Sequence, residues 1–285
     1  MADLLTVRKV LKDFLHPDIL IGTPVPVSGL QILKPYLLEK AGLSQDASVI
    51  MMAVPYYTTY CDMEHNVSVY SISEDYHRFF KALFDDLSVK LREACPDLVF
   101  SCFADHSPIA EVGAAVKSGL GVIGKNHLLI TKEYGSYVFL GELIVDLPCP
   151  EPVIPAQTEC INCGKCREVC PVHIDMSECL SALSQKKGDL SEAEAQRIQD
   201  APLRWGCDIC QSVCPMNRYR KYSEIPFFQE NAIPELSKDL MDQMTDEAFQ
   251  KRAFSWRGRA VPERNMKIRE DADKEQTDKE GGQDA

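Results

Sequence analysis

Four cysteines in the second half of the chain constrain it more than any other feature. Cys160, Cys163, Cys166 and Cys170 are followed by Pro171 and make a C-x2-C-x2-C-x3-C-P run. In proteins with two 4Fe-4S clusters, the first three thiolates of such a run bind one cluster and the fourth binds the other. The run therefore requires a second set of thiolates elsewhere in the chain.

The second set is Cys207, Cys210 and Cys214, the last followed by Pro215, and Cys179 lies between the two sets. Eight thiolates are enough for two clusters. We expect one cluster on Cys160, Cys163, Cys166 and Cys214, and the other on Cys170, Cys179, Cys207 and Cys210. Zinc ribbons also use C-x2-C pairs, but zinc needs neither a third cysteine at this spacing nor the Cys-Pro ending.

Composition places this chemistry in a reducing compartment. The chain has 12 cysteines in 285 residues, and neither its charged first residues nor any later segment matches a signal peptide or a membrane span. A cytoplasmic location would keep thiols reduced and favour metal chemistry over disulfides. The four cysteines outside the cluster motifs are expected to be small buried hydrophobic residues: Cys61, Cys95, Cys102 and Cys149. The net charge of -12 argues against a surface built for general nucleic-acid binding.

The first 150 residues alternate between strand and helix patterns. The apolar run 47–56 predicts a strand buried on both faces, and the spacing of apolar residues over 74–94 predicts an amphipathic helix. A strand at 98–103 is followed by a helix that we expect Ser107 to cap and Gly119 to end. Asp105 then lies on the loop between that strand and that helix.

Two further strands are expected at 127–131 and 137–147, joined by a turn around Tyr134 and Gly135. The sum is an α+β protein whose first domain is an α/β unit with a mixed sheet. We place that domain at 1–150. A proline-rich connection then leads into a ferredoxin-like double-cluster domain at 151–225. A short helical segment at 226–268 and a disordered acidic tail at 269–285 complete the chain.

A glycine-rich segment contains an apparent nucleotide motif. Gly119, Gly121 and Gly124 spell G-x-G-x-x-G, and Lys125 and Asn126 follow them. A dinucleotide or phosphate site of this type needs a strand before the glycines and a helix after them. Here the order is reversed, so we exclude nucleotide binding. The glycines are consistent with a loop against a bulky flat ligand, or with a tight structural turn.

Several strings together resemble the epoxyqueuosine reductase family over residues 47 to 268. They are Asp75-Tyr-His77, Asp105-His-Ser-Pro-Ile-Ala-Glu111, Gly119-Leu-Gly-Val-Ile-Gly-Lys-Asn126, Gly135-Ser-Tyr-Val-Phe-Leu-Gly-Glu142 and Gly206-Cys-Asp-Ile-Cys-Gln-Ser-Val-Cys-Pro215. The resemblance implies a reductase with two 4Fe-4S clusters and cobalamin bound by the first domain. Its substrate would be epoxyqueuosine in the anticodon loop of tRNA, and an electron donor such as flavodoxin or ferredoxin would supply a monomeric enzyme.

The same resemblance implies roles for individual residues. Asp105 matches the family's proton donor, and a carboxyl group held near a cofactor in a poorly solvated pocket would have its pKa raised. Tyr76 and His77 match a motif near the corrinoid, although such residues on an amphipathic helix more often serve packing. We add the glycine-loop residues Gly121, Gly124, Lys125 and Asn126 as cofactor contacts. Asp105 also has a purely structural alternative as a helix cap.

Two other functions remain open from the sequence. A corrinoid reductase of a different substrate would bind cobalamin without acting on tRNA, and a plain electron-transfer protein would hold clusters without a corrinoid. The Asp105 and glycine-loop motifs would be superfluous in a plain carrier and favour the reductase. Seven Lys or Arg residues between 251 and 269 suggest either phosphate contacts or a solvated helix face.

Overall fold

The computed structural model describes residues 3–149 and 159–281, which form two compact units. The first unit contains Met1–Tyr57, Tyr76–Lys165 and Val213–Ile225, and the second contains Thr58–Asp75, Cys166–Ser212 and Pro226–Ala285. The chain enters each unit more than once, whereas the sequence-based boundaries divide it into consecutive pieces. The proline-rich connection expected at the start of the cysteine module falls largely on residues 150–158, which lie outside the described residues.

A five-stranded sheet organises the first unit. Its strands are β1 (Leu20–Ile21), β2 (Val25–Pro26), β3 (Ser48–Pro55), β4 (Phe100–Phe103) and β7 (Val138–Val145). The order is β1-β3-β7-β4, with β2 also paired to β3, and every pair is antiparallel. The α+β class is confirmed, but the sheet is antiparallel rather than mixed, because β7 lies between β3 and β4, which run in the same direction.

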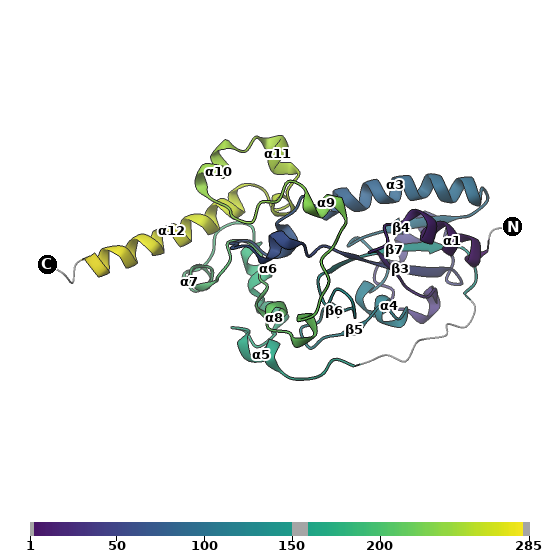
Figure 1. Ribbon diagram of the computed structural model, residues 1–285, viewed down its shortest axis with the longest axis horizontal. Helices are drawn as coiled ribbons and strands as arrows, with labels where there is room; N and C mark the ends of the chain where they lie inside the picture. The colour runs from purple at the N-terminus through teal and green to yellow at the C-terminus, as the bar shows by residue number, and fades with distance from the viewer. Residues whose placement is uncertain (1–2, 150–158, 282–285) are drawn as a thin grey trace. The chain divides into compact units, whose positions relative to one another are not determined.

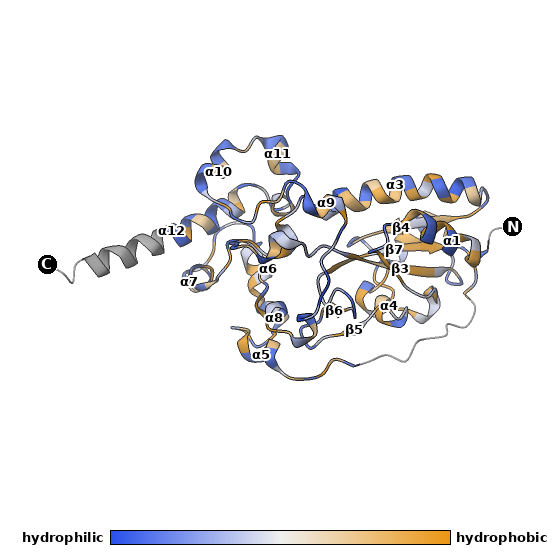
Figure 2. Ribbon diagram, in the orientation of Figure 1, coloured by the Kyte–Doolittle hydropathy of each residue, from blue (hydrophilic) through white to orange (hydrophobic). Residues whose placement is uncertain are grey.

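Helices cover both faces of this sheet. They are α1 (Leu4–Phe14), α2 (Pro35–Ala41), α3 (Tyr76–Ala94) and α4 (Glu111–Lys117). All eight residues of β3 are buried, which confirms the predicted doubly buried strand, and Figure 2 shows β3 and β7 as hydrophobic. Figure 1 shows α3 and α4 on opposite sides of the sheet. A side chain at Gly141 of β7 would meet the Phe80 ring, so this glycine lets α3 lie close to the sheet.

One local prediction in this unit is wrong. Ser107 does not cap a helix, because α4 begins at Glu111 and the Ser107 hydroxyl donates instead to Glu142 Oε1 at 2.6 Å. The strands predicted at 127–131 and 137–147 are present as β6 (Leu129–Ile130) and β7, and the Thr131 amide donates to the Gly135 carbonyl at 2.8 Å in the predicted turn between them. β6 pairs with β5 (Val122–Ile123), and the bond from the Gly124 amide to the Leu128 carbonyl closes that hairpin.

The second unit is built mainly from short helices. One of its apolar clusters consists of Leu180, Leu183, Ile198 and Ala201, and Trp205, Phe228 and Phe254 are also buried in this unit. The helices are α5 (Lys165–Val169, whose first residue belongs to the first unit), α6 (Leu180–Ser184), α7 (Glu192–Asp200), α8 (Ile209–Ser212), α9 (Pro226–Gln229), α10 (Lys238–Gln243), α11 (Asp246–Gln250) and α12 (Ala260–Gly281). Thr245 caps α11, since its side chain accepts from the Ala248 amide.

The helix α12 continues to Gly281, through residues for which the sequence predicts a disordered tail. Composition alone suggested disorder there, but the stretch is rich in Glu, Lys, Ala and Gln, which are strong helix formers. In the described part of the chain, we find no helix with the length and apolar character that crossing a bilayer requires.

Candidate active site and cluster cysteines

Asp105 lies two residues beyond β4, on the loop that leads to α4. Its φ of 59° is in the left-handed region, where aspartate is one of the few tolerated non-glycine residues. The Asp105 amide donates to Glu111 Oε1 at 3.1 Å, so the first turn of α4 holds this unusual backbone. The loop position predicted for Asp105 is confirmed, and the contact to Glu111 shows how the loop is held.

Two side chains from the first turn of α3 converge on the Asp105 carboxylate. The Tyr76 hydroxyl donates to Oδ2, and His77 Nε2 lies 3.2 Å from the same oxygen. The Tyr76 ring also stacks on Phe139 of β7, with centroids 4.1 Å apart and planes 13° apart. The structure therefore brings together three of the residues expected in the site, with Tyr76 and His77 as direct partners of Asp105.

These partners reverse the expected titration of Asp105. Burial alone would raise its pKa, but hydrogen bonds from His77 and Tyr76 and the charges of His77 and Lys34 together lower the pKa below its usual range. This direction is opposite to the raised pKa that the sequence suggested for a carboxyl group beside a cofactor, because two hydrogen-bond donors of the protein face this carboxylate. Asp105 is ionised at neutral pH in this arrangement.

Two other carboxyl groups near Asp105 hold protons more readily. Burial and the charge of Asp105 raise the pKa of Glu111 to about 7, against the opposing effects of the Asp105 amide and Lys34. Glu142 on β7 is completely buried, its Oε2 atom has no hydrogen-bond partner, and burial raises its pKa well above the usual range. The sequence patterns gave neither residue a role, although a glutamate within the apolar strand 138–145 could have indicated a functional carboxyl group.

The glycine-loop residues form a separate group on the β5–β6 hairpin. A side chain at Gly121 would meet the Ile130 carbonyl, and one at Gly124 would meet the Asn126 side chain, so close packing within the hairpin requires both glycines. Lys125 is exposed. Asn126 is only 5% exposed, yet neither its amide nitrogen nor its oxygen has a hydrogen-bond partner. A buried amide with two unsatisfied groups is costly and indicates a place for a ligand.

The structure brings three cysteines of the first expected quartet together in the first unit. Burial, and then the nearby thiols of Cys160 and Cys163, raise the pKa of Cys214, although hydrogen bonds from the Met216 and Asn217 amides oppose this effect. Cys166, the fourth member, lies in α5 and belongs to the second unit. Cys214 thus neighbours the first two cysteines of the C-x2-C-x2-C run, as the spacing predicts.

The second expected quartet lies wholly in the second unit. Burial, Asp208 and the nearby thiols of Cys179 and Cys170 raise the pKa of Cys207 to about 11. Cys210 follows on α8. The described thiols are free, and no three of the described His, Cys, Asp or Glu side chains are grouped closely enough to hold a single metal ion. In a 4Fe-4S cluster each of the four thiolates binds a different iron.

A buried carboxylate fixes the loop that carries Cys207 and Cys210. Asp208 accepts hydrogen bonds from Ser68 Oγ at 2.5 Å and from the Val69 amide at 2.8 Å. Gly206 has a φ of 73°, and a side chain there would collide with Ser68. The two loops therefore meet so closely that position 206 requires glycine.

Three arginines of the basic stretch at 251–269 are not free to bind phosphate. Arg252 donates to the carbonyls of Ile72 and Asn231, and Arg259 donates to those of Met241 and Met244 at 2.7 and 2.8 Å. Arg264 donates to the Lys186 and Gly188 carbonyls in the same way. These arginines are occupied in joining loops of the second unit.

Two family models match the chain. One, described as "Epoxyqueuosine reductase QueG, DUF1730", matches residues 40–106, and one described as "4Fe-4S double cluster binding domain" matches residues 159–217. Residues 159–217 are therefore a double-cluster domain, in agreement with the cysteine spacing.

Curated relatives and solved structures agree with these matches. The epoxyqueuosine reductase of Listeria monocytogenes is 30% identical over 274 residues, which cover 91% of this chain and 67% of that protein. That of Bacillus anthracis is 32% identical over 209 residues, covering 68% of this chain and 54% of that protein. This chain thus spans little more than half the length of some curated relatives.

The structure of the Streptococcus thermophilus epoxyqueuosine reductase superposes with a TM-score of 0.73 at 25% identity, covering 94% of this chain and 81% of that one. An epoxyqueuosine reductase crystallised with a tRNA-Tyr epoxyqueuosine-modified stem loop shares the fold, with a TM-score of 0.71 at 24% identity. That match covers 92% of this chain and 79% of the other.

Proposed function

Because this chain belongs to the epoxyqueuosine reductase family, we propose that it reduces epoxyqueuosine to queuosine in tRNA. The observation that carries the proposal is the Asp105 site: a carboxylate on a left-handed loop that contacts Tyr76, His77 and Glu111. A plain electron carrier has no use for such a proton-handling group. Removing an epoxide oxygen as water consumes two electrons and two protons, so a reductase needs both the clusters and an acid.

Asp105 supplies a proton to the departing oxygen in this proposal. Its lowered pKa makes the protonated form a strong acid, and the product carboxylate is stabilised by Tyr76 and His77. Glu111, with a pKa of about 7, retains a proton in a large fraction of molecules at neutral pH. We assign it the role of proton reserve for the Asp105 site, with Lys34 and Glu142 as the other charged or titratable groups that face it.

The β5–β6 hairpin fits a contact with cobalamin. Asn126 presents a buried amide whose nitrogen and oxygen are both unpartnered, and Ile123 is 50% exposed on the same hairpin. A corrinoid, which is flat and edged with amide groups, matches an apolar surface beside an amide that can donate and accept. When bound, cobalamin supplies a redox-active cobalt that can accept electrons from the clusters. Asn126, Gly124 and Lys125 would hold the cobalamin. Tyr76 and His77 instead contact the Asp105 carboxylate.

The cluster ligands follow from the spacing and from the neighbours of two thiols. We assign Cys160, Cys163, Cys166 and Cys214 to one cluster, and Cys170, Cys179, Cys207 and Cys210 to the other. The influence of Cys160 and Cys163 on Cys214, and of Cys170 and Cys179 on Cys207, supports this division. Clusters pass one electron at a time, so two successive transfers serve each reduction.

A short segment of the first unit suits a single-stranded RNA substrate. Arg218, Tyr219 and Lys221 are exposed, Tyr219 to 84%, and bases stack on exposed aromatic rings beside cations. The segment is held firmly, because the buried Asn217 side chain accepts from the Ser136 amide at 2.8 Å and donates to its hydroxyl at 2.9 Å. This segment replaces the stretch at 251–269 as the source of RNA contacts.

The test is an anaerobic assay of the full chain. The protein is reconstituted with iron, sulfide and cobalamin, reduced, and incubated with epoxyqueuosine-containing tRNA, whose nucleosides are then weighed by mass spectrometry. Loss of one oxygen atom from the modified nucleoside is the expected result. An unchanged nucleoside, from protein shown to hold both clusters and cobalamin, would reject tRNA as substrate and favour a corrinoid reductase of another compound. Protein that holds clusters but no cobalamin would favour the plain electron carrier.

A further inference from the structure

A cavity of about 370 Å³ opens beside Cys179 in the second unit. Its walls include one thiol of the second quartet, so it gives the approach to the cluster that we assign to that quartet. Most of its charged lining is basic. The cationic residues are Lys186, Lys187, Arg197 and Arg257.

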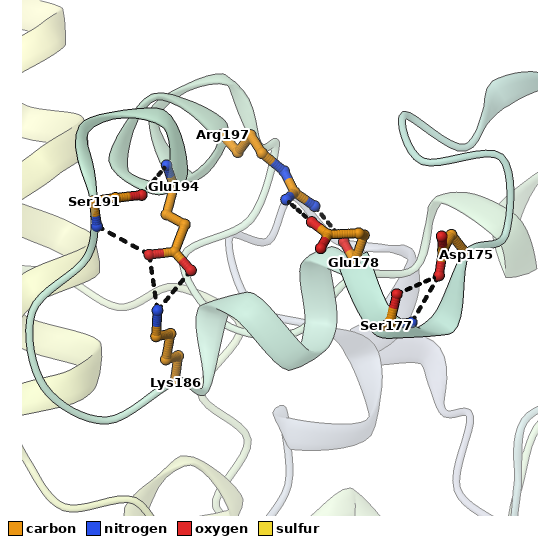
Figure 3. A network of polar contacts seen from close by, with 7 residues as sticks. All are labelled: Asp175, Ser177, Glu178, Lys186, Ser191, Glu194 and Arg197. Carbon is orange, nitrogen blue, oxygen red and sulfur yellow. Dashed lines mark hydrogen bonds and ion pairs between the residues drawn. The ribbon is translucent and has the colours of Figure 1, made fainter.

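Only part of this positive charge is neutralised. Arg197 pairs with Glu178 at 2.6 Å, and Lys186 pairs with Glu194 at 2.6 and 2.8 Å, as Figure 3 shows. Two of the four lining cations, Lys187 and Arg257, are in no ion pair that the structure describes between residues 159 and 281. The cavity therefore carries net positive charge in a protein whose overall charge is -12.

The cationic lining is held in place before any partner arrives. Glu194 accepts from the Ser191 amide at 2.9 Å in a capping box that starts α7, and this fixes the carboxylate that holds Lys186. The Arg197 guanidinium also donates to the Glu178 carbonyl, and the Asp175 side chain caps the turn that carries Glu178. Figure 3 shows these contacts as three groups: Ser191, Glu194 and Lys186; Arg197 and Glu178; and Asp175 and Ser177. Preorganised side chains lose little conformational entropy on binding.

An aromatic residue stands next to this lining. The Arg257 guanidinium lies 3.6 Å from the centroid of the Trp256 ring, and Trp256 Nε1 donates to Gln185, a lining residue, at 3.1 Å. Trp256 is nevertheless 53% exposed. An exposed tryptophan beside unpaired cations is typical of a protein-binding surface, since aromatic and arginine residues are enriched there.

We propose that this cavity and its Trp256 rim are the docking site of an acidic one-electron carrier protein, which reduces the cluster at Cys179. The inference rests on the cluster assignment of the proposed function. Each encounter moves one electron: the carrier is oxidised by one electron, the cluster is reduced by one, and no bond or proton is transferred. Two encounters supply the two electrons that one epoxide consumes.

A protein partner fits the lining better than RNA does. Glu178 and Glu194 stand among the cations, and their carboxylates would repel consecutive phosphates. A folded acidic surface can place its own donors against these two glutamates and its acids against Lys187 and Arg257. Interfaces for electron transfer are small and transient, and opposite charge mainly accelerates their formation. A compact charged cavity next to the redox centre meets those requirements.

The test measures cluster reduction in the full, cluster-loaded chain without tRNA. Reduced plant-type ferredoxin of net negative charge is mixed with the protein, and bleaching of the cluster absorbance is followed by stopped flow. The variant combines Lys187→Glu with Arg257→Glu. We expect its second-order rate to fall at least about tenfold and to lose its decline with added salt, because the steering charge is reversed. The control, Lys238→Glu, reverses an exposed lysine of α10 and should leave the rate unchanged.

Two further measurements keep the outcome interpretable. Photoreduction with uncharged deazariboflavin should reduce the clusters of both variants fully, which shows that the charge reversal left them intact. Calorimetry with oxidised ferredoxin should show weaker binding only for the double variant.

Equal ferredoxin rates in the wild-type chain and the double variant would overturn the docking site. A variant that keeps its ferredoxin rate but loses affinity for a tRNA stem loop would assign the cavity to RNA and also overturn it. A wild-type chain reduced through this site but inactive on epoxyqueuosine would reject the proposed substrate and leave the docking site standing.

Discussion

The two units hold their functional groups by different physical means. In the first, the Asp105 loop starts from a sheet whose central strand β3 is buried along its full length. In the second, the loops of Cys170, Cys179, Cys207 and Cys210 lie among helices that, apart from α12, have nine residues or fewer, and buried polar contacts join them. Asn265, for example, is fully buried and donates to the Ser184 and Arg204 carbonyls at 2.7 and 2.9 Å.

The Asp105 loop is therefore supported by apolar burial, whereas the cysteine loops of the second unit need bound metal for their stability. Burying large side chains stabilises the first unit at about 25 cal/mol per Å² of apolar surface, with or without a cofactor. The second unit also buries large side chains, among them Trp205, Phe228 and Phe254, but the contacts that hold its cysteine loops are largely polar and each add only about 1 kcal/mol net. Metal–thiolate bonds that exist only in the folded state then become part of its folding free energy. We therefore expect metal loss to affect the cysteine-bearing segment 166–212 far more than the sheet of the first unit.

The largest effect should come from removing a cluster ligand. Cys207→Ser should lower the iron content from about eight to about four atoms per chain and abolish electron delivery, because serine is a poor cluster ligand. Iron analysis and absorbance spectroscopy measure this change. Cys95→Ala, in the first unit, removes a buried thiol outside both quartets and should leave the iron content unchanged. Loss of iron in both variants would contradict the proposed difference between the cluster thiols of the second unit and the buried thiols of the first.

The next effect should be confined to chemistry in the first unit. Asp105→Asn keeps a side chain that tolerates the left-handed backbone but cannot supply an acidic proton, so deoxygenation should slow by about 10² to 10⁴. Single-turnover assays on epoxyqueuosine-containing tRNA measure the rate, with Asp85→Asn on α3 as the matched control. Normal iron content with normal rates in the Asp105 variant would exclude Asp105 as the proton donor.

A pair of core variants measures how each unit depends on its buried side chains for stability. Leu87→Ala on α3 opens a cavity in the first unit and should cost about 2–5 kcal/mol whether or not iron is bound. Asn265→Ala leaves two buried carbonyls unsatisfied in the second unit and should cost about 1–3 kcal/mol for each. Hydrogen exchange before and after iron chelation locates each effect. Chelation should expose amides at 166–212 while β3 stays protected, and loss of protection in β3 would contradict the comparison.

The smallest effect should be a change in pH dependence within the first unit. Glu111 titrates at about 7 in the folded protein against 4.5 in its ordinary state. Its protonation therefore adds stability that is fully present below about pH 4.5 and is lost as pH rises through about 7. Glu111→Gln cannot titrate, so the fall in unfolding free energy between pH 5 and pH 8 should become shallower.

Urea unfolding at several pH values measures that slope, and Glu39→Gln, an exposed glutamate on α2, serves as the control. The deoxygenation rate should likewise fall above pH 7 in the wild-type chain and stay low and flat in the Glu111 variant. If the unfolding free energy of the Glu111→Gln and Glu39→Gln variants changes equally with pH, Glu111 is not a proton reserve.

Short-range patterns determined much of this protein. The C-x2-C-x2-C-x3-C-P run and the later cysteines predicted a double-cluster domain, because thiolates of one cluster need spacings set by local chain geometry. The apolar run of β3 and the periodicity of α3 predicted both elements for the same reason: side-chain periodicity follows directly from backbone geometry. The loop position of Asp105 followed from the strand before it.

The tertiary structure decided which groups face one another across the sequence. No pattern placed β7 between β3 and β4, paired β6 with β5, or brought Tyr76 and His77 to the Asp105 carboxylate. Those contacts set the direction of each pKa shift, since burial and neighbouring charges compete at every carboxyl group. A proton is therefore held more readily at Glu111, whose pKa is raised to about 7, than at Asp105, whose pKa is lowered. Desolvation and charge proximity exist only after folding, so the sequence could name Asp105 as a candidate acid but could not give the direction of either pKa shift.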